Sequence, residues 1–286
     1  MNLATQQPAS GHEFPFTAAD FRTIVEIVYE RSGIVLAAHK RDMTYSRLVR
    51  RVRTLGLRSF SDYCALLQGK DGAKEIGFLI NAITTNLTKF FREPHHFDHL
   101  RDHVFKAQTG SSAGRRPIKI WSAGCSSGEE PYSIALTALA LPKDGSQPLD
   151  LRILATDLDT SMLKKAKAAV YPRASLESVP KAMQERFFSL RPQDPRSVHI
   201  AEAAQSLVTF RQLNLLGPWP MSGKFDVIFC RNVMIYFDAK TKAALVERFH
   251  GQLAEGGFFY VGHSESLLDH QARFKLCGRT VYQKVG

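Results

Sequence analysis

The chain has 286 residues, with 38 Lys and Arg against 27 Asp and Glu, and a formal net charge of +11. Its hydrophobic share of 44% is enough to build a buried core, which excludes the disordered and fibrous classes. No apolar run approaches the ~20 residues that span a bilayer, and the N-terminus lacks the basic and apolar regions of a secretion signal. We therefore expect a cytoplasmic globular protein that does not insert into a membrane. The four cysteines are far apart, so we expect neither a disulfide framework nor a bound metal.

The first part of the chain predicts a helical, basic domain. Residues 1–16 are polar, contain two prolines and are interpreted as a flexible tail. Thr17 and Asp20 have the spacing of a capping box, and the helix that they begin is expected to end at Gly33. The apolar spacing predicts further helices over residues 42–55, 59–67 and 73–84. The helix over 42–55 has a basic face, formed by Arg47, Arg50, Arg51 and Arg53.

From residue 118 onwards, short apolar segments alternate with helical stretches. Strands are expected at 118–122, 151–156, 208–213, 225–230, 257–261 and 280–284, and helices at 131–141, 161–169 and 239–253. This alternation is typical of an α/β domain built around a mainly parallel sheet. Residues 172–206 break the alternation and are interpreted as an insertion. We therefore expect a helical domain at 17–85 and an α/β domain at 86–286.

The first predicted strand runs into a turn of small residues between Ser122 and Gly128, and then into a helix. Such a unit lets a ligand approach the backbone at the carboxyl edge of a sheet. The turn holds only two glycines, Gly124 and Gly128, so the dinucleotide fingerprint G-x-G-x-x-G is absent. Glu129 and Glu130 stand where a pyrophosphate would lie and would repel it. A ligand that carries a cation and no phosphate fits this turn better.

The second predicted strand ends at Asp157, where a carboxylate can accept hydrogen bonds from both hydroxyls of a ribose. We infer S-adenosylmethionine as the ligand from three features together: the glycine turn, the acid at this strand end and the lack of a phosphate-binding motif. The alternative is that Asp157 only caps the helix that begins near Ser161.

Several segments in order resemble a known family, the chemotaxis receptor methyltransferases (CheR-like protein-glutamate O-methyltransferases). They include ITTNLTKFFREPHHF, WSAGCSSGEEPYSIA, ILATDLD, FRQLNLL, FDVIFCRNVMIYFD and GGFFYVGHSESL, and the similarity covers most of the chain. The resemblance implies an all-helical N-terminal domain, followed by a Rossmann-like class I methyltransferase domain with a small inserted β-subdomain at 172–206. It also implies methyl transfer from S-adenosylmethionine to receptor glutamates, which leaves S-adenosylhomocysteine and adjusts receptor signalling.

The resemblance assigns roles to residues in the matching motifs. Arg92 and Tyr236 would contact the reacting groups. The cofactor would be bound by residues from each of the motifs, namely Asn86, Thr88, Arg92, Gly124, Glu130, Asp157, Asn214, Leu215, Arg231 and Asn232. Glu130 is preferred to Glu129 as the cofactor contact. A glutamate side chain, with a pKa of about 4.3, is ionised at pH 7, so this reaction requires no general base.

The basic face of Arg47, Arg50, Arg51 and Arg53 is interpreted as a surface that binds the acidic helical domain of a cytoplasmic receptor. The alternative is a solvated arginine face, and a phosphate backbone would attract the same charges. No motif for nucleic-acid modification is present, so we expect no nucleic-acid partner, and we expect a monomer. Two rivals stay open: a methyltransferase that acts on another acceptor, and a regulatory protein that binds the cofactor without catalysis.

Two further patterns are assigned no chemistry. His95, His99 and His103 have helical spacing, but Phe97, Leu100 and Val104 define the buried face, and the histidines are expected on its flank rather than around a metal. The segment Gly262–Ser266 does not satisfy the nucleophile elbow G-x-S-x-G and is expected to shape the rim of the pocket.

Overall fold

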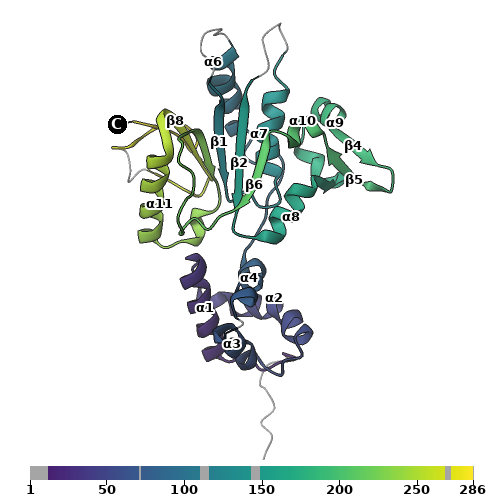
Figure 1. Ribbon diagram of the computed structural model, residues 1–286, viewed down its shortest axis with the longest axis vertical. Coiled ribbons are helices and arrows are strands. Elements are labelled where there is room, and N and C mark those ends of the chain that lie inside the picture. The colour runs from purple at the N-terminus through teal and green to yellow at the C-terminus, as the bar shows by residue number, and fades with distance from the viewer. Residues whose placement is uncertain (1–11, 71, 110–115, 143–148, 268–271, 286) are drawn as a thin grey trace, which may run out of the picture. The chain divides into compact units, whose positions relative to one another are not determined.

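The computed structural model describes residues 12–285, except residue 71 and residues 110–115, 143–148 and 268–271 (Figure 1). The chain divides into two compact units between Thr85 and Asn86. Residues 1–11 of the predicted tail lie outside the described residues. The rest of that tail packs against the first unit, where His12 stacks on Tyr45 with ring centroids 3.7 Å apart and Phe16 is buried. Within the described residues, none of the helices is both long and apolar enough to span a bilayer.

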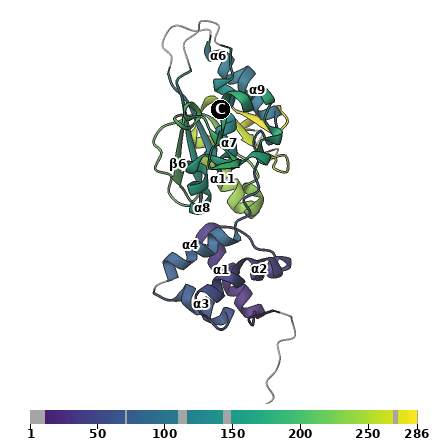
Figure 2. The same cartoon turned by 90° about the vertical axis from the view of Figure 1, so that its right-hand side faces the viewer.

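The first unit is helical and consists of α1 (Ala18–Ser32), α2 (Arg41–Thr54), α3 (Phe60–Gln68) and α4 (Gly72–Ile83), with a short 3-10 turn at Ala38–Lys40 (Figure 2). Both predicted boundaries of α1 are confirmed: Thr17 and Asp20 form a capping box, and Gly33 ends the helix with a φ of 71°. The apolar faces of these helices meet in one core, which includes Ile24, Leu48, Phe60 and Leu79.

The second unit contains a seven-stranded sheet in the order β6-β2-β1-β7-β8-β10-β9. Its strands are β1 (Ile118–Ala123), β2 (Leu151–Asp157), β6 (Val208–Gln212), β7 (Phe225–Cys230), β8 (Leu253–Val261), β9 (Phe274–Gly278) and β10 (Val281–Lys284). The first five strands in this order are parallel, and β10 is antiparallel to both of its neighbours. The predicted mainly parallel α/β sheet is therefore confirmed, with β9 as an edge strand that was not predicted.

Helices cover both faces of this sheet. One face packs on α7 (Glu129–Leu139) and α8 (Thr160–Ala168), and Ile120 of β1 and Tyr132 of α7 belong to the same core cluster. The other face packs on α11 (Ala239–Gln252), where Trp121 lies 5.3 Å from Phe249 between ring centroids. Ahead of β1, α5 (His95–His99), a π-helical stretch (Leu100–Phe105) and α6 (Lys106–Thr109) follow one another without a break.

A small antiparallel sheet, β3-β5-β4, is inserted between α8 and β6. Its strands are β3 (Val170–Pro172), β4 (Phe188–Arg191) and β5 (Asp194–Ile200). They are accompanied by a 3-10 helix (Arg173–Ser178), α9 (Lys181–Phe187) and α10 (Glu202–Gln205), beside the large sheet in Figure 1. The predicted inserted β-subdomain is present, but it begins at Val170 rather than residue 172, because Val170 and Tyr171 already pair with β5.

Candidate functional site

The predicted cofactor residues lie at the carboxyl ends of the parallel strands. Gly124 follows β1, Asp157 ends β2, Asn214 follows β6, and Arg231 follows β7. Because parallel strands end at one edge of a sheet, these residues from distant parts of the chain meet there. A hydrogen bond from the Leu213 N–H to the Asp157 carbonyl, at 3.0 Å, fixes the segment after β6 beside the end of β2.

The turn after β1 requires glycine at Gly124. Its φ is +84°, and a Cβ at this position would lie 2.4 Å from Cγ2 of Val233. Both the left-handed backbone and the close approach to the loop after β7 exclude a side chain here. The turn therefore presents bare backbone to the edge of the sheet.

The carboxylate of Asp157 faces this turn. It accepts hydrogen bonds from the Ser126 N–H at 2.7 Å and from the Asp159 N–H at 2.8 Å. The cap of α8 is Asp159, whose Oδ1 accepts from the Ser161 and Met162 N–H groups, so the alternative that Asp157 caps this helix is wrong. Burial raises the pKa of Asp157 above its ordinary value.

Asn86 lies beside the same turn. Its side-chain amide donates to Oδ2 of Asp159 at 2.8 Å, and its carbonyl accepts from the Ser126 hydroxyl at 3.1 Å. The first residue of the second unit is therefore tied to the ends of both β1 and β2.

A buried ion-pair network centres on Arg231, whose side chain is only 2% exposed. Its Nη1 donates to Glu130 at 3.0 Å, and its Nη2 lies 3.4 Å from Glu93 and also donates to the carbonyl of Arg92. Glu130 accepts a second hydrogen bond, from the Ser122 hydroxyl at 2.7 Å. The guanidinium thus connects the start of α7 with the segment around Arg92, and Glu130 extends the network to the end of β1. Its charge is balanced by carboxylates of the protein itself.

Burial and these partners set the charges of the network. Burial raises the pKa of Glu130, while Arg231 and Ser122 act in the opposite direction. Burial also acts to raise the pKa of Glu93, but Arg231 and His263 outweigh it, and the pKa is lowered. Glu129 lies apart from this network: it accepts from the Ser127 hydroxyl at 2.7 Å, and burial raises its pKa.

The remaining candidate residues take varied positions. Arg92 is half-buried and donates from Nη1 to the carbonyl of Leu87 at 3.0 Å. Thr88 is half-buried, and Tyr236 is half-buried at the end of the 3-10 turn Met234–Tyr236. Asn232 has a left-handed backbone, with a φ of +58°.

Asn214 and Leu215 shape the turn after β6. The Asn214 side-chain oxygen accepts from the Leu216 N–H at 3.0 Å. Leu215 is buried, and its carbonyl accepts from Arg248 at 2.6 Å and from the Trp219 indole at 3.0 Å. Both residues are therefore fixed by local hydrogen bonds rather than left free to move.

The arginines of the predicted basic face are mostly engaged within the first unit. Arg47 donates to the carbonyls at the end of α4, including that of Ile83 at 2.6 Å, and so caps that helix. Arg51 pairs with the buried Glu75 at 2.5 Å, and Arg53 pairs with Glu13. Arg50 is exposed.

The structure gives roles to residues that the sequence left unassigned. Glu93, in the FRE motif, belongs to the Arg231 network, and Glu265, in the segment after β8, is a buried carboxylate hydrogen-bonded to backbone amides. His99 lies 2.7 Å from the Tyr260 hydroxyl, and His95 lies 3.0 Å from the Arg279 carbonyl. These two histidines therefore make structural hydrogen bonds.

One cluster has the composition of a metal site. Glu93, His95 and His96 each offer a potential ligand atom, and these atoms lie within 4.8 Å of one another. However, one carboxylate oxygen of Glu93 already faces Arg231 and the other faces His263. We therefore assign Glu93 to the ion-pair network.

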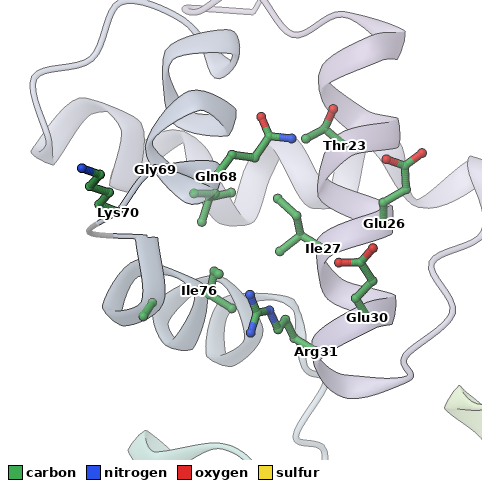
Figure 3. Close-up of a pocket in the computed structure, with 11 residues that line it drawn as sticks. Thr23, Glu26, Ile27, Glu30, Arg31, Gln68, Gly69, Lys70 and Ile76 are labelled. Carbon is green, nitrogen blue, oxygen red and sulfur yellow. The ribbon is translucent and has the colours of Figure 1, made fainter.

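A hollow of about 390 Å³ opens in the first unit, and Figure 3 shows its lining. The glutamates Glu26 and Glu30 of α1 face it, together with Ile27, and Lys70 and Ile76 line it from the region of α3 and α4. None of the predicted site residues lines this hollow, and its mixture of both charges selects no ligand class.

Comparison with known proteins agrees with this arrangement. Residues 86–283 match the family model "CheR methyltransferase, SAM binding domain", and residues 19–84 match "CheR methyltransferase, all-alpha domain". The chemotaxis protein methyltransferase 2 of Pseudomonas aeruginosa is 43% identical over 99% of both chains. A probable chemotaxis protein methyltransferase of Rhizobium etli is 46% identical over 84% of this chain and 90% of its own length. The chemotaxis protein methyltransferase of Escherichia coli is 43% identical over 92% of this chain and 90% of its own.

Proposed function

Because the chain belongs to the CheR methyltransferase family, we propose that it transfers a methyl group from S-adenosylmethionine to glutamate carboxylates of chemoreceptors. The products are glutamate methyl esters, which adjust receptor signalling, and S-adenosylhomocysteine. The helical domain, 17–85, contacts the receptor, and the domain at 86–286 performs the transfer. The protein acts as a monomer in the cytoplasm.

The observation that carries this proposal is the charge of the site. Glu93, Glu130 and Asp157 supply three carboxyl groups at the edge of the sheet, against the buried guanidinium of Arg231 and the half-buried Arg92. This excess of negative charge favours a cationic ligand and disfavours one with phosphates. S-adenosylmethionine fits, because it supplies a methyl group bound to a positively charged sulfur and carries no phosphate.

The cofactor's adenosine end is assigned to the ends of β2 and β6. A carboxylate can accept about four hydrogen bonds, and the backbone amides of Ser126, Leu158 and Asp159 act on Asp157, so an acceptor position remains for a ribose hydroxyl. Asn214 and Leu215 flank the adenine, and the bare backbone at Gly124 allows close approach. Asn86 supports the turn through Ser126.

The methionine end is assigned to the residues around the ion-pair network. Glu130 faces the positively charged part of the cofactor, and Arg231 holds Glu130 in place. Thr88, Arg92 and Asn232 complete the wall at which the methyl group is transferred.

The reaction needs alignment more than acid–base chemistry. The receptor carboxylate is ionised at neutral pH and attacks without a base. Arg92 can bind this carboxylate through two parallel hydrogen bonds, and Tyr236 can donate a third. Holding the two reactants in line and excluding water is worth up to about 7–11 kcal/mol when the geometry is fully constrained.

This division of roles is tested with Arg92→Ala and Tyr236→Phe. Each is expected to lower kcat on a receptor cytoplasmic fragment by at least ~10-fold, since each removes a hydrogen bond to the attacking carboxylate, worth about 1.5–3 kcal/mol. The dissociation constant for S-adenosylmethionine should change by less than ~3-fold. Arg152→Ala, at the opposite end of β2 and 71% exposed, is the control and should change neither. Equal losses of turnover and affinity would place Arg92 and Tyr236 in the wrong part of the site.

The receptor surface is assigned to the arginines of α2. Arg50 is exposed and contacts the receptor directly, and Arg47, which donates to backbone carbonyls, adds positive charge near it. Arg51 and Arg53 are paired with Glu75 and Glu13 and add little net charge. Binding of a receptor fragment and of double-stranded DNA is compared as the salt concentration rises. The proposal predicts tighter binding of the receptor fragment at every salt concentration, weakened by Arg50→Glu. Tighter binding of DNA would favour a methyltransferase with a nucleic-acid acceptor.

A further inference from the structure

One buried carboxylate, that of Glu265, holds the loop that follows β7. Its side chain belongs to the segment after β8, and the residue is 7% exposed. Oε2 accepts hydrogen bonds from the Asn232 N–H at 2.8 Å and from the Gly262 N–H at 2.6 Å. Oε1 accepts from the Val233 N–H at 3.1 Å and from the Ile235 N–H at 3.3 Å. Four backbone amides from two loops therefore converge on one side chain.

The same loop is enclosed on two sides by glycines. A Cβ at Gly262 would lie 2.4 Å from Nδ2 of Asn232 and 2.8 Å from Oε2 of Glu265, so only glycine permits this approach. On the other side, Gly124 leaves room for Val233. The loop also contains a residue with a left-handed backbone, Asn232 with a φ of +58°, a conformation that asparagine adopts more readily than other residues with a side chain.

We infer that Glu265 is a positioning residue for methyl transfer, which keeps the loop of residues 231–236 in its reactive geometry. The inference rests on the proposed function, in which Asn232 and Tyr236 of this loop face the reacting groups. An ionised carboxylate suits the task because it only accepts hydrogen bonds and has places for about four donors. A displacement of about 1 Å at reacting groups can cost ~100-fold in rate.

The test is Glu265→Gln, which preserves the length of the side chain. Its amide nitrogen is a donor and would face backbone N–H groups, so at most two of the four hydrogen bonds survive. We expect kcat at saturating substrates to fall at least ~30-fold, while the dissociation constant for S-adenosylmethionine changes by less than ~3-fold, because Asp157 and the segment after β6 still hold the adenosine end.

The matched control is Asp226→Asn. Asp226 also accepts a backbone amide, that of Lys119 at 2.8 Å, but it lies near the opposite end of β7. This control should lower stability without changing kcat by more than ~2-fold. A folded Glu265→Gln protein with kcat within ~3-fold of the parent would overturn the inference. So would equal losses of kcat and cofactor affinity, because the loop would then act only in binding.

A second measurement needs no substitution. Amide hydrogen exchange in the native protein should be slow at Asn232, Val233, Ile235 and Gly262, and exchange as fast as in an unbonded loop would overturn the inference. If Glu265→Gln does not fold, this readout still tests whether the loop is restrained, and fast exchange overturns the inference. It also separates the two proposals. If exchange is slow but the protein does not methylate a receptor fragment, the receptor is not the acceptor, while the restraint of the loop by Glu265 is still supported.

Discussion

Replacing Arg231 by Met should destabilise the second unit strongly. The Arg231 side chain is 2% exposed, and its acidic partners Glu93 and Glu130 are 11% and 12% exposed. Removing one partner from a buried pair typically costs about 3–5 kcal/mol, because the other charge stays buried and uncompensated. Here two carboxylates lose their shared cation, so we expect a loss of at least ~3 kcal/mol in the free energy of unfolding.

The assay is urea unfolding followed by tryptophan fluorescence. Both tryptophans of the chain, Trp121 and Trp219, lie in the second unit, so the signal reports on that unit. The control is Arg116→Met, which removes a guanidinium that is 64% exposed and paired with Asp226. Exposed pairs contribute at most ~1 kcal/mol, so this variant should remain close to the parent.

The loss of stability in Arg231→Met should also depend on pH. Without the guanidinium, the pKa of Glu93 in the folded state rises above the unfolded value of about 4.3, and the pKa of Glu130, which is already raised, rises further. The folded variant then binds protons that the unfolded chain has released, so the loss relative to the parent grows as the pH rises above ~4. A loss below ~1 kcal/mol, or one that is equal at pH 5 and pH 8, would refute the reasoning.

Three further predictions concern the turn after β1, the end of β2 and α5. Asp157→Asn should weaken binding of S-adenosylmethionine by about 10–150-fold in calorimetry, since hydrogen bonds to charged groups are worth about 1.5–3 kcal/mol, and a change below ~3-fold would contradict the assignment. Gly124→Ala should lower the free energy of unfolding by about 1–3 kcal/mol, because its Cβ would lie 2.4 Å from Val233 at a φ of +84°; an unchanged urea midpoint would contradict this. Burial, with Arg231 nearby, lowers the pKa of His96 to about 2. Below pH ~6.5 the unfolded chain therefore takes up a proton that the folded chain does not. As the pH falls, the free energy of unfolding decreases by up to about 1.4 kcal/mol per pH unit. His96→Gln should reduce the slope of the free energy of unfolding against pH by that amount. An unchanged slope would contradict the lowered pKa of His96.

Features fixed by near neighbours in sequence could be predicted. Thr17 and Asp20 are three residues apart, and the capping box that they form depends on little else. The alternation of apolar strands and helices likewise predicts the parallel sheet. The apolar composition of a buried strand can be recognised without knowing which strands lie beside it. Strand β9 escaped prediction because, of its five residues, only Phe274 is buried, so it has no clear apolar pattern.

Features fixed by distant residues could not be predicted. Helical periodicity places Arg51 and Arg53 on the surface of α2, but their partners Glu75 and Glu13 are 24 and 40 residues away in the chain. Nothing local therefore shows that these charges are engaged. Glu265 is similar, because its hydrogen bonds reach back about 30 residues to the loop after β7. The sequence signal for it is weak: an acid four residues after the predicted strand 257–261.

The measurement that tests the central claim most directly is transfer of labelled methyl from S-adenosylmethionine to a receptor cytoplasmic fragment, followed by mild alkali. The account predicts that alkali releases the label as methanol, because a carboxyl methyl ester hydrolyses under these conditions. Label that survives alkali would place the methyl group on nitrogen or sulfur and contradict a glutamate acceptor. Cofactor binding without any transfer of label would contradict the receptor as substrate and favour a regulatory protein.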